Sequence, residues 1–137
     1  MADCIFCRIA RGDAHAHVVH EDELVVAFLD NGPIRPGHTQ IITREHVPYF
    51  EDLSPEAASH ILGLGQRIAK AMKQIYGVPR VGFAFTGGDV AHVHAHVIPL
   101  VEKGDITSQR YSAGPIPTPP EAEQIATIAQ LKAALEG

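Results

Sequence analysis

Hydrophobic residues recur along the chain with two different periods, and the shorter period predicts strands. The stretch HVVHEDELVVAFLD, residues 17–30, holds two apolar runs joined around the polar residues 21–23, and short apolar runs rich in β-branched residues are typical of strands. HTQIITRE, residues 38–45, and VGFAFTGG, residues 81–88, predict two more strands. The loop NGPIRPG, dense in Gly and Pro, separates the second strand from the third.

The longer period predicts helices. Ser54 as N-cap and Pro55 at the first helical position begin a long helix that Gly77 closes. Its apolar residues repeat at intervals of three and four: Ile61, Leu64, Ile68, Met72 and Ile75. Residues 3–10 predict one or two helical turns. Residues 103–120 predict a Pro-rich extended arm that leads into a last helix, whose apolar side is expected to comprise Ile125, Ile128, Leu131 and Leu135.

The stretch HVHAHVIP, residues 92–99, alternates three histidines with small or branched apolar residues. Successive side chains of a strand face opposite ways, so the histidines are expected to share one exposed face of a fifth strand. The apolar residues between them would pack on the core. Pro99 cannot donate a hydrogen bond to a sheet, so it is expected at the end of the strand or at an edge.

Together these elements predict an α+β fold. Short turns join the strands except where the long helix intervenes, so we expect a five-stranded antiparallel sheet with one long helix across it and a C-terminal helix. The chain is expected to form a single domain, residues 1–137, with its core at about residues 3–103 and the arm and last helix at 104–137. A small open sheet exposes its edges, so pairing with a second copy is expected.

Composition and charge narrow the class of protein. The chain has 137 residues, 45% of them hydrophobic and 20% charged, which suits one globular domain with a core. It has no apolar run of transmembrane length and no signal-like start, which predicts a cytoplasmic protein. A net charge of -5 argues against a general binder of nucleic-acid polymers or membranes, although a local nucleotide site is compatible with it. Cys4 and Cys7 indicate cytosolic thiols or metal ligands.

The three alternating histidines allow three interpretations. The chain has nine histidines, so the three could simply fill the polar face of a strand. They could bind a metal ion, but alternate Cα atoms of a strand lie about 6.6 Å apart and His92 and His96 about 13 Å apart, so one ion would bind at most two of them. They could also form a catalytic group in which a central histidine attacks an acyl or phosphoryl centre. Its neighbours would then supply hydrogen-bond donors and a proton.

The chain resembles a known family over roughly residues 3–103. HVHAHV with the following Ile98 fits the pattern His-φ-His-φ-His-φ-φ, φ being apolar, of the histidine triad (HIT) family. CIFCRIARGD is similar to the N-terminal signature of its zinc-bearing bacterial members, and VVAFLDNGPIRPGHTQIITREH resembles the family's strand–loop–strand block. The resemblance implies an antiparallel sheet with a long helix, and a homodimer with one continuous sheet.

The resemblance also implies roles for individual residues. His94 would be the nucleophile that takes up a nucleoside monophosphate, and His96 would contact the phosphate and assist the leaving group. His38 would be the additional active-site histidine, and Asp30 would bind the ribose hydroxyls. The residues that match the ligands of the zinc-bearing members are Cys4, Cys7, His46 and His92.

The turn before the triad departs from the family pattern. Its backbone N–H groups suit phosphate oxygens, so Gly87, Gly88 and Asp89 are expected at the nucleotide site. The better-known hydrolases carry Gly-Gln-Ser/Thr here, so the amide and hydroxyl side chains that would contact the phosphate are missing. Asp89 adds a potential negative charge near an anion site. Two alternatives to the activity of those hydrolases therefore stay open, a changed substrate and a weak activity.

The function expected from the resemblance is nucleotidyl transfer or hydrolysis. The reaction would occur at the α-phosphorus of nucleoside phosphoramidates or dinucleoside polyphosphates, through a nucleotidyl-histidine intermediate. Zinc would be structural, and no metal would be needed for the chemistry. One alternative is a non-catalytic nucleotide-binding or partner-binding module with the same fold. Another is a metallohydrolase with two triad histidines on a catalytic ion.

Overall fold

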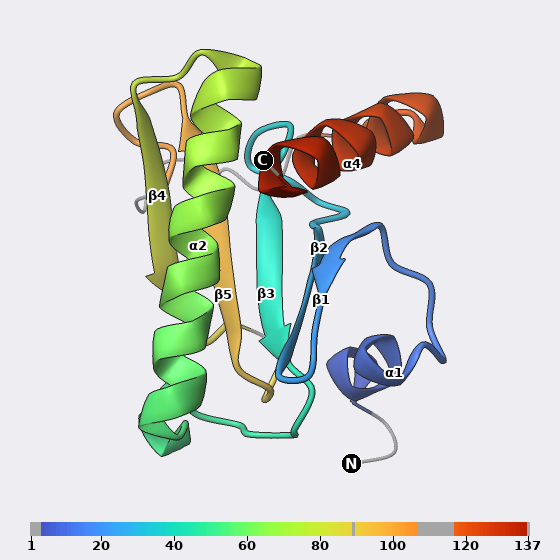
Figure 1. Cartoon of the computed structure of the whole chain (residues 1–137), viewed down its shortest axis with the longest axis vertical. Helices are drawn as coiled ribbons and strands as arrows, with labels where there is room; N and C mark the ends of the chain where they lie inside the picture. Colours follow the sequence, from blue (N-terminus) through green and yellow to red (C-terminus); the bar gives the residue numbers. More distant parts are fainter. Residues whose placement is uncertain (1–3, 89, 107–116, 137) are drawn as a thin grey trace.

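The computed structural model of the protein describes residues 4–88, 90–106 and 117–136. Five strands form one antiparallel sheet in the order β1-β2-β3-β5-β4. The elements are α1 (Ile5–Arg11), β1 (Val18–Glu21), β2 (Val25–Leu29), β3 (Thr39–Thr43), the short 3-10 helix η1 (Phe50–Asp52), α2 (Pro55–Tyr76), β4 (Arg80–Phe85), β5 (His94–Leu100) and α4 (Glu121–Glu136). The predicted α+β fold is confirmed (Figure 1).

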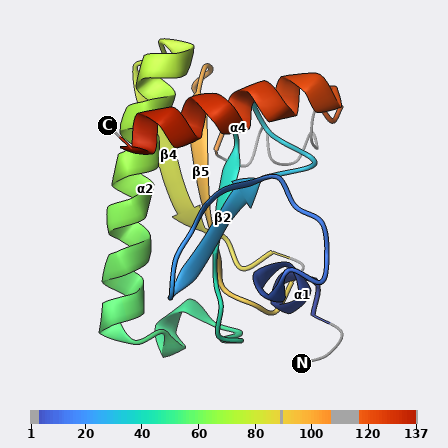
Figure 2. The ribbon, with the colours of Figure 1, turned by 45° about the vertical axis from the view of Figure 1, so that its right-hand side comes forward.

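The two faces of the sheet have different cover. Side chains of β2, β3 and β5 such as Ala27, Ile41 and Val97 pack with the buried residues of α2 and with Leu131 of α4. The α4 helix crosses the end of the sheet beside α2 (Figure 2). The opposite face carries Ile42 and the triad histidines, and α1 covers only part of it. This second face holds the candidate site.

The sequence signals at both ends of α2 act as expected. The Ser54 side chain accepts a hydrogen bond from the N–H of Ala57 at 3.0 Å, and Gly77 ends the helix in a left-handed conformation with φ 65°. The predicted apolar face is buried, apart from Ile75, which is partly buried. Each fully buried side chain contributes roughly 1.5–3 kcal/mol, so this face outweighs the two helix glycines, which cost about 1 kcal/mol each.

The prediction for the C-terminal helix was wrong in one position. Ile125 is 56% exposed, while Gln124 and Thr127 are buried beside Leu131. The apolar residues of α4 therefore form a less regular face than their spacing suggested, and two polar side chains share the contact with the rest of the protein. Most of the predicted extended arm, residues 107–116, lies outside the described residues, as does Asp89.

The prediction for the histidine strand was wrong in two respects. The strand β5 begins at His94, and His92 lies in the bend before it, where its N–H bonds the carbonyl of Val90 at 2.9 Å. The imidazoles are also buried, with exposed fractions of 0% for His92 and 6% for His94 and His96. The ring of Phe6 from α1 lies edge-on to His92 and His94, with centroids 5.8 and 5.0 Å away. This cover explains the burial at that end.

Pro99 lies in β5, which is an interior strand. It is paired with Val81 of β4, whereas the pairing with β3 ends at Val97. The proline therefore lies past the end of the pairing with β3 and one residue before β5 ends at Leu100, close to the predicted strand end.

The sheet ends at β1 on one side and at β4 on the other. Val81, Phe83 and Phe85 of β4 are only partly buried, which makes this edge the place where a second copy would pair. Dimer formation stays a prediction. None of the described helices is both long and apolar enough to cross a membrane.

Two glycines of α2 provide a test of its packing. A Cβ atom on Gly65 would lie 2.7 Å from the ring of Phe83, while one on Gly63 would meet no described atom within 4 Å. We expect Gly65→Ala to lower the free energy of unfolding by about 1–3 kcal/mol and Gly63→Ala to raise it by up to about 1 kcal/mol. Urea denaturation measures both, and equal effects of the two substitutions would contradict the packing described here.

Candidate active site and metal centre

Four side chains from three segments converge beside α1. One ligand atom from each of Cys4, Cys7, His46 and His92 lies within 4.8 Å of the others. Cys4 Sγ lies 3.3 Å from His92 Nδ1, Cys7 Sγ lies 3.1 Å from His46 Nδ1, and the two Nδ1 atoms are 3.3 Å apart. Ligand atoms of tetrahedral zinc at ordinary bond lengths lie about 3.3–3.8 Å apart. The four residues therefore fit one zinc ion with little movement.

Backbone contacts hold this cluster together. Cys4 is the N-cap of α1, and its Sγ accepts the N–H of Cys7 at 3.5 Å. The N–H of Val93 bonds the carbonyl of Val47 at 2.8 Å, which joins the segments that carry the two histidines. His92 Nε2 lies 2.7 Å from the carbonyl oxygen of Thr43 and donates to it. The lone pair of His92 is then on Nδ1, which faces the thiols.

Burial affects the protonation of the cluster. Burial lowers the pKa of His92, although its hydrogen bond to Thr43 opposes the shift. The ring is therefore neutral at pH 7, the form that binds metals. Burial also raises the pKa of the Cys7 thiol, as does the hydrogen bond with Cys4. A cation would counteract this effect on the thiol.

The next histidine, His94, begins β5 with one ring nitrogen bound and the other accessible. Its Nδ1 lies 2.7 Å from the carbonyl oxygen of His92. A carbonyl only accepts, so Nδ1 carries the proton and Nε2 carries the lone pair. A Cβ atom on Gly88 would lie 3.4 Å from Nε2. The absence of a side chain at Gly88 therefore leaves room for a group to approach this nitrogen.

His38 and His96 form a chain of hydrogen bonds with a defined direction. The N–H of Ile34 donates to His38 Nδ1 at 3.1 Å, so the proton of this ring is on Nε2. His38 Nε2 donates to His96 Nδ1 at 2.8 Å. The proton of a neutral His96 is then on its own Nε2. This buried atom has no hydrogen-bond partner within the described part of the chain.

Burial also determines the charge of these two rings. Burial, together with the neighbouring His38 and His94 rings, lowers the pKa of His96 to about 4. Burial likewise lowers the pKa of His38, while the charge of Asp30 opposes the shift. At pH 7 His96 is therefore neutral and presents an N–H donor at the site. The rings of His94 and His96 are in edge-on contact, with centroids 5.3 Å apart.

Asp30 follows β2 and is held in one orientation. One carboxylate oxygen accepts the N–H of Gly32 at 2.8 Å, and the other accepts the side-chain amide of Gln40 at 2.8 Å. The second oxygen is also 3.5 Å from His38 Nε2. The two adjacent histidines, His38 and His96, and this carboxylate lie at the same end of the site. His94 lies at the other end of the site, where β5 begins next to the turn that contains Gly88.

An ion pair that sequence reasoning missed supports the loop before His38. Arg35 donates two hydrogen bonds of 2.8 Å to Asp105, which is 1% exposed. Burial would raise the pKa of Asp105, but the bonds from Arg35 and from the backbone N–H groups of Glu102 and Val101 lower it to about 2. The carbonyl of Arg35 accepts the N–H of His38 at 3.0 Å. The pair thus ties the loop to the end of β5.

The comparisons with known proteins agree with this arrangement. The model of the HIT domain matches residues 11–103. The chain belongs to the HIT domain family. A HIT-like protein of Borreliella burgdorferi is 37% identical over 106 residues, which cover 72% of this chain and 76% of the relative. The adenosine 5'-monophosphoramidase hnt1 of Schizosaccharomyces pombe is 37% identical over 97 residues, which cover 70% of this chain and 73% of the relative.

A solved HIT structure extends the likeness to nearly the whole chain. It is the structure of a Zn-bound histidine triad family protein from Mycobacterium smegmatis, with 31% identity and a TM-score of 0.80. The match covers 98% of this chain and 94% of that one. The five-stranded antiparallel sheet with its helices is thus the HIT fold.

The structure brings together most of the residues that the sequence singled out. The described residues of the predicted catalytic and nucleotide-binding sets lie on or beside the histidine face, and the four predicted metal ligands form one cluster. Sequence reasoning missed Gln40, which orients Asp30. Gln40 stands two residues after His38, and the period of a strand would have placed it near the histidines. The Arg35–Asp105 pair spans seventy positions and gives no local signal.

The protonation of His96 can be measured directly. A ring buried among other imidazoles resists protonation, so we expect His96 to remain neutral until the pH falls to about 4. An unfolded chain takes up this proton near pH 6.5, so the contribution of His96 to stability is lost as the pH falls from about 6.5 towards 4. NMR titration of the ring in the unliganded protein tests this, and a midpoint near 6.5 would show the environment described here to be wrong.

Proposed function

We propose that this protein is a nucleotidyl hydrolase or transferase that forms a covalent intermediate on His94. Its substrates would be nucleoside phosphoramidates or dinucleoside polyphosphates, attacked at the α-phosphorus. One observation carries the proposal: the rings of His94 and His96 are in edge-on contact, and hydrogen bonds on the Nδ1 atoms leave a lone pair on Nε2 of His94 and a proton on Nε2 of His96. The likeness to an adenosine 5'-monophosphoramidase supports it.

The first step is attack of His94 Nε2 on the phosphorus. The bond from phosphorus to the leaving nitrogen or oxygen breaks, while Nδ1–H of the same ring stays bound to the carbonyl of His92. An anionic phosphate next to His96 opposes the desolvation that lowers the pKa of this ring. The His38–His96 pair therefore takes up one proton with the substrate. His96 gives this proton to the leaving atom.

The second step reverses these roles. Water attacks the phosphorus of the nucleotidyl-histidine, the bond to Nε2 breaks, and the His38–His96 pair takes the proton of the water. A nucleoside monophosphate is released and His94 is neutral again. Asp30 would accept hydrogen bonds from the ribose hydroxyls, since its orientation is already held by Gly32 and Gln40. Gly87 and Gly88 would offer backbone N–H groups to the phosphate.

A catalytic metal ion is less well supported. Ligand atoms of Asp30, His38 and His96 lie within 4.8 Å of one another, a spacing at which three side chains could hold one metal ion. However, His38 Nε2 and His96 Nδ1 are bound to each other at 2.8 Å, and His38 Nδ1 accepts a backbone N–H. An ion would have to break the bond between the rings. The geometry therefore favours a proton pair over a catalytic ion.

A binding module without turnover is the rival function. It is motivated by the turn before the triad, where Gly88 and Asp89 replace the amide and hydroxyl side chains of the better-known hydrolases. Such a module would bind a nucleotide at Asp30 and the triad without cleaving it. Measurement of turnover separates the two functions.

We also propose a structural zinc ion at Cys4, Cys7, His46 and His92. Four thiol and imidazole ligands form a closed set, typical of structural zinc. The ion would hold α1 against the segments that precede η1 and β5. The Zn-bound HIT relative supports this assignment. The chemistry on the phosphorus would use the histidines alone.

Replacement of the nucleophile gives the sharpest test of the reaction. We expect His94→Ala to lower turnover by about 10⁴–10⁶, because it removes a covalent step. His96→Ala should cost about 10²–10⁴, as expected of a proton donor. His15→Ala, on the exposed segment before β1, is the matched histidine control and should keep full turnover.

The intermediate itself can be detected. Mass spectrometry of protein quenched during turnover should show one added nucleoside monophosphate, acid-labile as a phosphoramidate is, in the wild type and none in His94→Ala. Wild-type turnover by His94→Ala on a substrate that the enzyme cleaves would refute the proposed nucleophile.

Metal analysis tests the zinc proposal. We expect about one zinc per chain in freshly purified protein and none in the Cys4→Ala, Cys7→Ala double variant. The double variant should have a lower melting temperature, because the metal joins three segments of the fold. Its loss of stability should exceed its loss in the chemical step. Full zinc content in the double variant would refute this ligand set.

A further inference from the structure

Two histidines and a glutamate meet where the segment before β1 passes the start of α4. His15 and His17 lie in an extended segment, and their rings are in edge-on contact with centroids 4.9 Å apart. Glu121 is the first residue of α4, and its two carboxylate oxygens lie 3.0 and 3.1 Å from His17 Nε2. One ligand atom from each of the three residues lies within 4.8 Å of the others. Neither the proposed reaction nor the proposed zinc cluster beside α1 uses this group.

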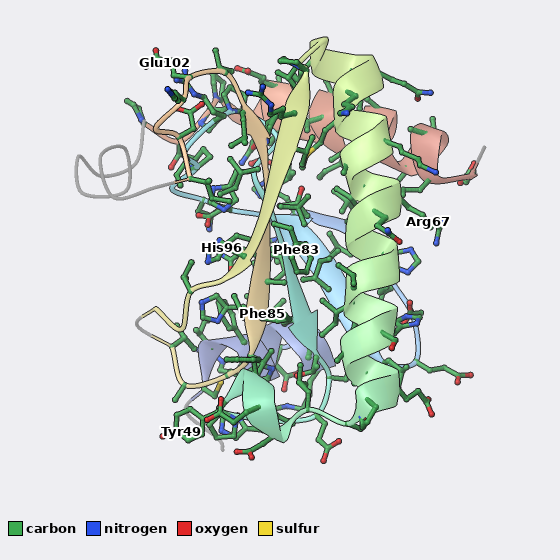
Figure 3. The ribbon with its side chains drawn as sticks, turned by 90° about the vertical axis from the view of Figure 1, so that its left-hand side faces the viewer. Tyr49, Arg67, Phe83, Phe85, His96 and Glu102 are labelled. Carbon is green, nitrogen blue, oxygen red and sulfur yellow. The ribbon has the colours of Figure 1, made fainter. Side chains whose placement is uncertain are left out.

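The group lies on the helix side of the sheet, away from the triad histidines. Val18 packs in the cluster that includes Phe6, whereas Val19 belongs to the core under α2. Side chains alternate along an extended segment, so His17 lies on the same side as Val19. Figure 3 shows His96 on the side of the sheet away from α2. The sheet therefore separates this group from the proposed nucleophile.

The three donors suit a divalent transition-metal ion. Imidazole and carboxylate ligands are typical of Zn²⁺, Cu²⁺ and Ni²⁺ sites, whereas Ca²⁺ and Mg²⁺ prefer oxygen ligands alone. Nitrogen and oxygen ligands of tetrahedral zinc lie about 3.3–3.5 Å apart, so the carboxylate has to withdraw slightly from His17. Glu121 and His15 are exposed, which gives both side chains room to move. Water would complete the coordination.

His17 is the fixed member of the group. Its side chain is 10% exposed, and its carbonyl accepts the N–H of Leu29 at 3.0 Å. A carboxylate only accepts, so a neutral His17 carries its proton on Nε2 when it bonds Glu121. Nδ1 has no hydrogen-bond partner within the described part of the chain. The proton can therefore move to Nδ1 without the loss of a bond there, and Nε2 then offers its lone pair to an ion.

The first half of α4 has little apolar attachment of its own. Within residues 121–127 the buried side chains are those of Gln124 and Thr127, both polar, while Ile125 is exposed. The buried amide nitrogen of Gln124 has no hydrogen-bond partner among the described residues, and such a group opposes docking of the helix. An ion at Glu121 would join this weakly held end of α4 to the segment before β1.

We propose that His15, His17 and Glu121 form a second metal site, which binds a divalent transition-metal ion such as Zn²⁺ and fastens the start of α4. The proposal is independent of the proposed reaction, and we expect occupancy of the site to leave turnover unchanged. The site has three protein ligands and no thiol, so it should bind zinc more weakly than the four-ligand cluster beside α1.

Calorimetry on protein that already has zinc in the four-ligand cluster measures the second site. We expect the wild type to bind about one further Zn²⁺ per chain. His15→Ala and Glu121→Gln should each weaken this binding about 10-fold or more, since even the outer partners of a metal ligand are worth about 10–100-fold. Two matched controls should bind the further ion as the wild type does. Glu123→Gln removes the same charge two residues along α4, and His20→Ala removes another histidine, on β1.

Two further measurements report the effect of the ion on the structure. Zinc should slow hydrogen exchange of the amides in the first half of α4 about 10-fold or more in the wild type, because binding stabilises the docked helix. The same zinc should have little effect on these amides in His15→Ala. In long-range proton–nitrogen correlation NMR, zinc should move the ring proton of His17 from Nε2 to Nδ1.

Three results would overturn the proposal. If the wild type binds no further zinc at millimolar concentration, His17 and Glu121 form an ion pair only. If His15→Ala and Glu121→Gln bind the further ion as tightly as the wild type, or if His96→Ala abolishes its binding, the ion lies elsewhere. If both variants weaken the binding but zinc leaves hydrogen exchange in α4 unchanged in the wild type, the ion does not fasten the helix.

Discussion

Buried imidazoles need hydrogen-bond partners, and this constraint determines the chemistry available on the histidine face. Each of the rings of His38, His92 and His94 has one nitrogen bound to a backbone group. Backbone carbonyls accept and N–H groups donate, so the partner decides which nitrogen keeps a lone pair. His38 in turn determines which nitrogen of His96 carries the proton, because His38 Nε2 donates to His96 Nδ1. Bare nitrogens and N–H donors consequently occupy known positions before any ligand arrives.

His92 connects the two functional parts of the protein. Its ring belongs to the four-ligand cluster, while its carbonyl accepts Nδ1–H of His94. A metal ion on this ring would therefore hold the carbonyl that sets the tautomer of the proposed nucleophile. On the other side of His94, the loop with His38 is tied to Asp105 through Arg35. The nucleophile thus lies between two supports, which suits a reaction that depends on alignment.

The sequence predicted what local patterns encode. Ser54 and Gly77 marked the ends of α2, and alternation marked the histidine face. The same alternation failed at His92, because this residue lies in the bend that precedes β5. The alternation also gave no measure of burial, because the cover of the histidines comes from α1. The stacking of Phe50 on Phe85 was also missed, since the segment around Phe50 and the end of β4 at Phe85 meet only in the folded chain. Contacts between distant segments have no period that a sequence displays.

The proposed reaction requires that the fold present His94 with a bare Nε2 and His96 with a protonated one. Long-range proton–nitrogen correlation NMR of the histidine rings in the unliganded protein measures this most directly. We expect the Nδ1–H tautomer for His94 and the Nε2–H tautomer for His96 at pH 7. An Nε2–H tautomer for His94 would contradict it, because the nitrogen that faces Gly88 would then have no lone pair with which to attack phosphorus.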